Sequence, residues 1–202
     1  MGWEILLNDN WRFHKGDICV ERPIAKGPIY SQSKTERKKL GPASYHYHDN
    51  PDDYGISRIT SENWVICQLP HDYVINQDND PNQNNAHGYF RYDNAWYRKR
   101  FSLPAGCENK RVLLRFDGIA GNATIYLNGC LLHHNYSAYN TFEIDISDLV
   151  YRNKENVLAV YVNTQEFEGW WYQGGGIYRD VHLVITDPVA IDLWGVYAPS
   201  RK

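Results

Sequence analysis

The feature that most constrains this chain is the alternation of apolar and polar residues along its second half. In RVLLRFD, Val112, Leu114 and Phe116 fall on one side of a period of two, and the charged residues fall on the other. WYRKRFSL, ATIYL and TFEIDI alternate in the same way, whereas VLAVYV is apolar on both sides. Successive side chains of a strand point to opposite faces, so these segments predict strands with one buried face. VLAVYV predicts a central strand that is covered on both faces.

Turn signals separate these segments. After ATIYL, Asn128-Gly129 supplies two residues that readily adopt the positive φ of a tight hairpin turn. IYRDVHLVIT, which follows three glycines, predicts another strand. No segment carries a sustained apolar stripe at helical spacing, so little helix is expected beyond one turn near residues 34–40. Several short strands between turns are typical of an all-β sandwich or barrel.

The rest of the chain reads as loops and a tail. Residues 15–60 mix glycine, proline, charge and aromatics, which predicts a long excursion over the sandwich. Residues 76–87, NQDNDPNQNNAH, are almost wholly polar turn formers and predict a surface loop. The apolar run at 189–197 predicts a last strand. We therefore expect one domain over residues 1–187, and a last strand with the start of a linker over residues 188–202.

Composition excludes several classes of partner. The net charge is −3 with both signs scattered, so neither nucleic acid nor an anionic membrane surface is expected as a partner. The N-terminus lacks the pattern of a signal peptide, and no apolar run approaches the ~20 residues of a membrane span. Four widely spaced cysteines predict reduced thiols and a cytoplasmic location. The 7 Trp and 16 Tyr suit either a β-sheet core or a site for partly apolar, polar ligands.

Few residues of the chain are candidates for catalysis or for binding an anion or a metal. The three glycines of EGWWYQGGGIYRDV precede a predicted strand and no Lys-Ser/Thr step, so they predict a tight turn or close backbone approach rather than a phosphate loop. His46 and His48 share one face of any strand near Asp49, but without an evident third metal ligand. His71-Asp72 could form half of a nucleophilic triad, but no serine elbow or reactive cysteine accompanies them. We predict no cofactor, no metal ligand and no catalytic residue.

Seven segments, taken in order, resemble the N-terminal sugar-binding domain of glycoside hydrolase family 2, the family of the β-galactosidases. They are NDNWRFHKGD, NWVICQLPHDYVI, GYFRYDNAWYRKRFSLP, LRFDGIAGNATIYLNG, FEIDISDLV, ENVLAVYVNT and WWYQGGGIYRDVHL. The resemblance implies an all-β jelly-roll β-sandwich of the galactose-binding-domain type. It also implies that an immunoglobulin-like domain and a barrel with two catalytic glutamates follow, so that this chain alone is inactive.

The resemblance also implies a site. In the family, loops of this domain help to wall the sugar subsite at the mouth of the barrel. The matching positions here are Glu168, Trp170, Trp171 and Tyr172, with His71 and Asp72 expected near the same mouth. Trp170 stands where some relatives have an aspartate. The implied partners are a β-galactoside or related β-linked sugar and the remaining domains of the enzyme, with homo-oligomerisation left open.

Alternatives remain at each level. Trp170 or Trp171 would stack on a pyranose while Glu168 accepts hydroxyl hydrogen bonds, or Trp171 and Tyr172 would simply pack beneath the strand. Arg179-Asp180 is expected to be a structural pair whose members face different neighbours. The domain could also be a stand-alone carbohydrate-binding module, or a scaffold for docking domains or subunits.

Overall fold

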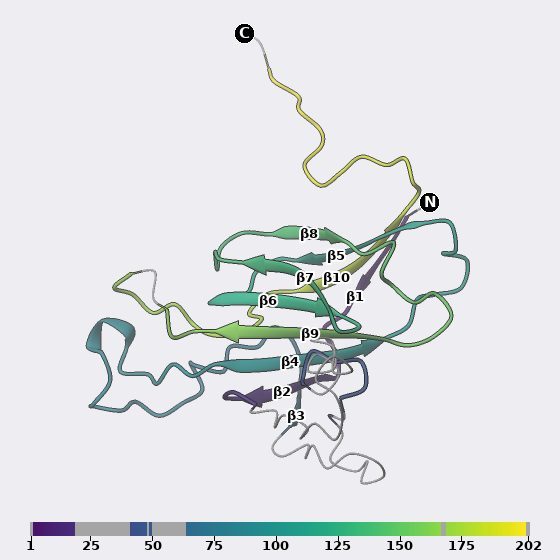
Figure 1. Cartoon of the computed structure of the whole chain (residues 1–202). Coiled ribbons are helices and arrows are strands. Elements are labelled where there is room, and N and C mark those ends of the chain that lie inside the picture. The colour runs from purple at the N-terminus through teal and green to yellow at the C-terminus, as the bar shows by residue number, and fades with distance from the viewer. Residues whose placement is uncertain (1, 19–40, 48, 50–63, 167–168, 201–202) are drawn as a thin grey trace, which may run out of the picture.

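Two antiparallel sheets carry the strands in the part of the chain that the structure describes (Figure 1). The computed structural model describes residues 2–18, 41–47, 49, 64–166 and 169–200. The four-stranded sheet has the order β1-β10-β5-β8, and the six-stranded sheet has the order β3-β2-β4-β9-β6-β7. The strands are β1 (Trp3–Leu6), β2 (Trp11–Lys15), β3 (Val65–Cys67), β4 (Ala95–Phe101), β5 (Arg111–Phe116), β6 (Asn122–Leu127), β7 (Cys130–Asn135), β8 (Phe142–Asp145), β9 (Asn156–Asn163) and β10 (Val181–Thr186).

The expected all-β sandwich is confirmed. Within the described ranges, the one helical element is a single 3-10 turn, η2 (Asn85–His87). It lies in the polar segment 76–87, which forms turns and is largely exposed, as predicted for a surface loop. The helical turn expected near residues 34–40 and most of the excursion at 15–60 lie outside the described residues.

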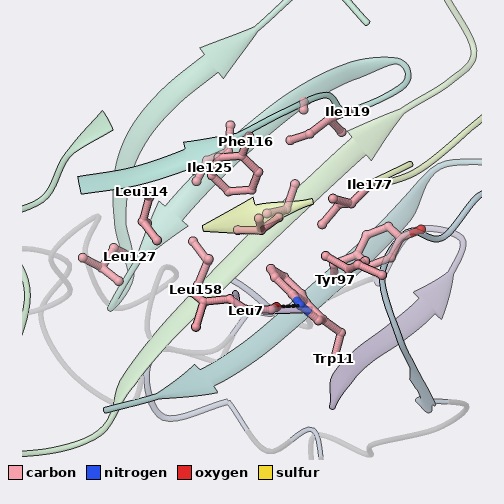
Figure 2. Packing of buried hydrophobic residues seen from close by; sticks show 14 of the residues in the cluster. Leu7, Trp11, Tyr97, Leu114, Phe116, Ile119, Ile125, Leu127, Leu158 and Ile177 are labelled. Carbon is pink, nitrogen blue, oxygen red and sulfur yellow. Dashed lines mark hydrogen bonds between the residues drawn. The ribbon is translucent and has the colours of Figure 1, made fainter. Parts of the chain in front are cut away.

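The alternation read from the sequence defines the core. Val112, Leu114 and Phe116 of β5 are fully buried between the sheets, and Figure 2 shows Leu114 and Phe116 facing side chains of β6 and β9. β9 lies between β4 and β6, so it is central and buried on both faces, as its apolar sequence predicts. At the predicted hairpin between β6 and β7, Asn128 and Gly129 have φ values of 52° and 88°.

The strand after the three glycines begins later than predicted. β10 starts at Val181, which pairs with Phe116, and not at Ile177. Gly176 forms an isolated bridge with Ala120, and the carbonyl of Ile177 accepts a hydrogen bond from the amide of His71 at 2.8 Å. Residues 177–180 therefore join the sheet to a loop before the regular ladder begins.

The predicted last strand at residues 189–197 is absent: the described residues 188–200 contain no strand. Lys110 forms an ion pair with Asp187, and Arg111 forms one with Asp192 at 2.6 Å, but none of the described strands pairs with the segment. A strand needs a hydrogen-bonding partner, so the apolar pattern alone does not form one. The apolar side chains of this tail are strongly exposed, at 71–93%, and are Val189, Ile191, Trp194, Val196 and Tyr197.

A buried arginine anchors the described part of the long excursion. Arg98 of β4 points away from the core side of the strand, yet it is fully buried beneath residues 41–47 and 49. Its guanidinium donates to the Asp49 carboxylate at 2.7 Å and to the carbonyls of Ser44 and Tyr47, each at 3.1 Å. The Asp49 of the SYHYHD segment is therefore committed to an ion pair. His46 lies in a turn rather than on a strand, which removes the geometry assumed for a metal site, and His48 lies outside the described residues.

Candidate functional site

The candidate site lies at one end of the sandwich, on the left of Figure 1, where three connections come together. They are the loop between β9 and β10, the polar loop before β4 that contains η2, and the connection between β7 and β8. The first of these carries WWYQGGG. Its Gly169 carbonyl accepts a hydrogen bond from Nε2 of His87 at 2.8 Å, which ties it to the polar loop.

The glycines let this loop pass close to the core. Gly174 and Gly176 have φ values of 71° and 115°, in the region that favours glycine. A Cβ on Gly174 would lie 2.7 Å from the Asp72 carboxylate, and one on Gly176 would lie 2.2 Å from the Tyr97 hydroxyl and 2.6 Å from the His71 carbonyl oxygen. Close approach and positive φ thus both require glycine, as the sequence predicted.

Asp72 joins the LPHD segment to the loop that carries the three glycines. Its carboxylate accepts hydrogen bonds from the Tyr172 hydroxyl at 2.7 Å and from the amide of Gly175 at 3.1 Å. It also accepts from the amides of Val74 at 2.9 Å and Ile75 at 3.4 Å in its own loop. Burial and the neighbouring carboxylate raise the pKa of Tyr172 above its ordinary value, so the phenol keeps its proton and remains a donor at neutral pH.

His71 serves a different partner from Asp72. Its Nδ1 is 2.8 Å from the hydroxyl of Tyr97, and its ring meets the ring of Phe13 edge-on at 4.8 Å. Burial lowers the pKa of His71, which favours the neutral ring. Because His71 faces the core and Asp72 faces the glycine loop, the geometry disfavours the triad alternative. It indicates instead that both residues help to hold the glycine loop in place.

The aromatic residues before the glycines differ sharply in exposure. The side chain of Trp170 is 90% exposed, and that of Trp171 is 48% exposed. The indole N–H of Trp171 donates to the Tyr139 hydroxyl at 3.0 Å, so this half-exposed ring is fixed in place. Tyr172 is half-buried and packs edge-on against Phe90 at 5.5 Å. Of the predicted site residues, the structure thus brings Tyr172 and Asp72 into contact.

The other predicted positions have separate surroundings. Glu168 lies outside the described residues. Arg179 and Asp180 serve different neighbours, as expected: the Asp180 carboxylate accepts from the Asn8 amide at 2.7 Å, while the Arg179 guanidinium lies over the Tyr178 ring at 5.1 Å. Sequence reasoning missed His87 and Tyr139, which are 82 and 32 residues from their partners in this loop. No local pattern marks such pairs.

The described residues include no helix with the length and apolar character needed to cross a membrane.

Comparison with known proteins identifies the fold and the family. Among curated proteins, the β-galactosidase BoGH2A of Bacteroides ovatus is 30% identical over 201 residues, which cover 97% of this chain and 20% of that protein. A β-glucuronidase of Formosa agariphila is 28% identical over 163 residues, which cover 71% of this chain and 16% of that protein. A solved β-glycosidase structure from Bacteroides vulgatus is 27% identical with a TM-score of 0.70, over 92% of this chain and 20% of that one.

The chain therefore spans about a fifth of the length of the Bacteroides ovatus and Bacteroides vulgatus relatives. A family model described as the galactose-binding domain-like domain of glycosyl hydrolase 2 matches residues 56–171, more than half of the 202 residues. This agrees with the resemblance of the seven sequence segments, and the protein belongs to the galactose-binding-like domains of glycosyl hydrolase family 2.

Proposed function

We propose that this chain is the non-catalytic, carbohydrate-binding domain of a family 2 glycoside hydrolase that removes terminal β-linked sugars, with β-galactosides as the first substrate class. The observation that carries the proposal is Trp170, a 90% exposed indole on a loop that the hydrogen bond from Tyr172 to Asp72 anchors. A β-galactosidase and a β-glucuronidase among the relatives support terminal β-linked sugars as substrates, and the first of them supports β-galactosides.

An exposed indole suits a sugar for a physical reason. Its flat apolar face can stack on the C–H face of a pyranose, and its N–H can still hydrogen bond. Trp171 and Tyr139, joined by their hydrogen bond, provide a second, fixed aromatic surface beside it. Glu168 is proposed as an acceptor for sugar hydroxyls, while His71 and Asp72 contribute by positioning the loop.

We further propose that the sugar subsite is shared with other domains of a longer polypeptide. The relatives are about five times longer than this chain, which leaves ample sequence for a catalytic barrel. Residues 188–202 would lead into the next domain. The exposed apolar side chains of residues 189–197 also favour a second role, in which this domain docks against other domains.

The test is a sugar titration followed by NMR of the seven tryptophan indole N–H signals. The Trp170 signal is assigned by its absence in Trp170→Phe. Trp194→Phe, which replaces another exposed tryptophan at 75% exposure, is the matched control. We expect galactose or glucuronate to move the Trp170 signal only weakly, with a Kd of about 1 mM or above, equivalent to about −4 kcal/mol or weaker.

The outcomes separate the alternatives. Binding with a Kd near about 1 μM would contradict the shared subsite and favour a stand-alone module. No movement of Trp170 at any sugar concentration would favour the docking role alone. The chain by itself should release no nitrophenol from nitrophenyl β-galactoside, and measurable turnover would contradict the non-catalytic assignment.

We propose a cytoplasmic location. The described cysteines, Cys67, Cys107 and Cys130, are free thiols, which fits a reducing compartment.

A further inference from the structure

One group of side chains, apart from the aromatic loop residues, has the arrangement of metal ligands. Among the described residues, Asp117, Asp180 and His182 each offer one ligand atom, and these atoms all lie within 4.8 Å of one another. Asp117 follows β5, Asp180 precedes β10, and His182 lies in β10, next to β5 in Figure 1. The antiparallel ladder continues past the strands, because the Asp117 amide donates to the Asp180 carbonyl at 3.0 Å. The backbone thus fixes the three residues side by side.

Neighbouring groups orient the ligand atoms. Nδ1 of His182 is 3.0 Å from the Glu4 carboxylate, and Nε2 is 3.2 Å from the Asp117 carboxylate. A carboxylate that accepts from one ring nitrogen and leaves the other free for a cation is the usual support of a metal-bound histidine. The Asp180 carboxylate is likewise fixed, since its Oδ1 accepts from the Asn8 amide at 2.7 Å.

The charges at this point of the sheet favour a cation. Asp117 and Asp180 are cross-strand neighbours, and like charges in that relation are destabilising. Arg115 pairs with one of these two carboxylates, with Nε 3.5 Å from Asp117, but it also pairs with Glu4. The guanidinium of Arg179 donates at 3.4 Å to the carbonyl of Asp117, not to its carboxylate. Three carboxylates, those of Glu4, Asp117 and Glu143, therefore share the charge of Arg115.

The geometry points to a divalent-cation site, of the Zn²⁺ class, formed by the carboxylates of Asp117 and Asp180 and by Nε2 of His182. An imidazole nitrogen with two carboxylate oxygens suits Zn²⁺ better than Mg²⁺ or Ca²⁺, which prefer oxygen ligands alone. In a tetrahedron with bonds of about 2.0 Å, ligand atoms lie roughly 3.3 Å apart. The 3.2 Å between Nε2 of His182 and Oδ2 of Asp117 already meets this spacing.

The site would clamp the start of β10 to the end of β5, and through Glu4 and Asn8 to the N-terminal segment. Sequence reasoning predicted no metal ligand, because Asp117 and His182 are 65 residues apart and carry no ligand spacing. The alternative without a metal is a doubly protonated His182 that donates to Glu4 and Asp117 at once.

The test is Zn²⁺ binding to the 202-residue chain, measured by calorimetry, with thermal unfolding in Zn²⁺ and in EDTA. We expect one Zn²⁺ per chain and a higher Tm with Zn²⁺. Asp180→Asn keeps the side-chain shape, and His182→Gln keeps a hydrogen-bonding group in place of the ring. Each variant should bind Zn²⁺ at least about tenfold more weakly, since loss of even an outer partner costs about 10–100-fold. Glu143→Gln on β8, also near Arg115 but outside the group, should bind as tightly as the original chain.

Two further measurements need no variant. After Zn²⁺ is added, NMR of the histidine ring nitrogens should show a proton on Nδ1 of His182 and none on Nε2. Co²⁺ in place of Zn²⁺ should show no thiolate charge-transfer band. Thiolate bands, protonation of both His182 nitrogens in Zn²⁺, or Zn²⁺ binding that survives in both variants would each overturn the assignment.

Discussion

Gly176→Ala tests the origin of the three glycines directly. A Cβ at this position would lie 2.2 Å from the Tyr97 hydroxyl and 2.6 Å from the His71 carbonyl oxygen, at a φ of 115°. Neither neighbour can move freely, because Tyr97 is fully buried and the His71 oxygen belongs to the backbone. The new methyl group must therefore displace the loop from the core.

Two costs combine in this variant. An L-residue in the left-handed region costs about 1–2 kcal/mol, and a forced contact in a packed interior costs about 1–3 kcal/mol. We expect Gly176→Ala to lower the free energy of unfolding by about 2–5 kcal/mol. Gly16 provides the matched control: its φ is 97°, and a Cβ there meets nothing within 4 Å. Gly16→Ala should lose only the backbone part, about 1–2 kcal/mol.

The assay is urea unfolding followed by circular dichroism, with linear extrapolation to water for both variants. The difference between them isolates the steric contact, and we expect it to be at least about 1 kcal/mol. Equal losses would refute the argument, because they would show that the loop can retreat from Tyr97 and His71 without cost.

Three further predictions concern other contacts. Asp49→Ala should lower the free energy of unfolding in urea by about 3–5 kcal/mol, because it leaves the buried guanidinium of Arg98 without its carboxylate partner. A loss below about 1 kcal/mol would show that water reaches the guanidinium. Burial raises the pKa of Asp49, but the charge of Arg98 and its hydrogen bond outweigh burial, so the pKa lies below the ordinary value for an aspartate. Because the pKa of Asp49 is lower in the folded than in the unfolded chain, the ionised carboxylate stabilises the fold at pH values above its unfolded-state pKa. This stabilisation should be lost as the pH falls through the folded-state pKa. In Asp49→Ala, the Tm should therefore change less with pH in this acidic range. Tyr172→Phe should cost about 1–2 kcal/mol, less than additively with Asp72→Asn, and additive losses would contradict their hydrogen bond. Trp170→Ala should change the unfolding free energy by less than about 0.5 kcal/mol, because the side chain is exposed, and a larger loss in thermal unfolding would place it in packing.

Much of the sandwich could be predicted because strand alternation is local. Each of β4 to β6, β8 and β9 was recognised from its own residues, and so was the Asn128-Gly129 hairpin. The strand predictions were wrong where a segment has the local pattern of a strand but lacks a neighbouring strand to pair with. Residues 189–197 form an apolar run that resembles a strand, yet none of the strands in the described part of the chain pairs with them.

The candidate site was predicted in residue type but not in role. Trp170, Trp171 and Tyr172 were found from the family resemblance, and the structure separates them into an exposed ring, a ring held by Tyr139 and a phenol that binds Asp72. Exposure depends on which loops come together, and residue order does not encode that locally. The partners that decide it are 32 to 100 residues away.

The sequence by itself determined the all-β class, the buried face of most strands and the need for glycine before Ile177, since each depends on backbone preference and period within a few residues. The tertiary structure alone decided that Asp72 supports the aromatic loop, that Arg98 is buried with Asp49, and that Asp117, Asp180 and His182 meet. These pairings follow from sheet register and loop crossings, where hydrogen bonds join residues far apart in the chain. The amino-acid sequence determines which side chains are present, but the fold determines which of them contact one another.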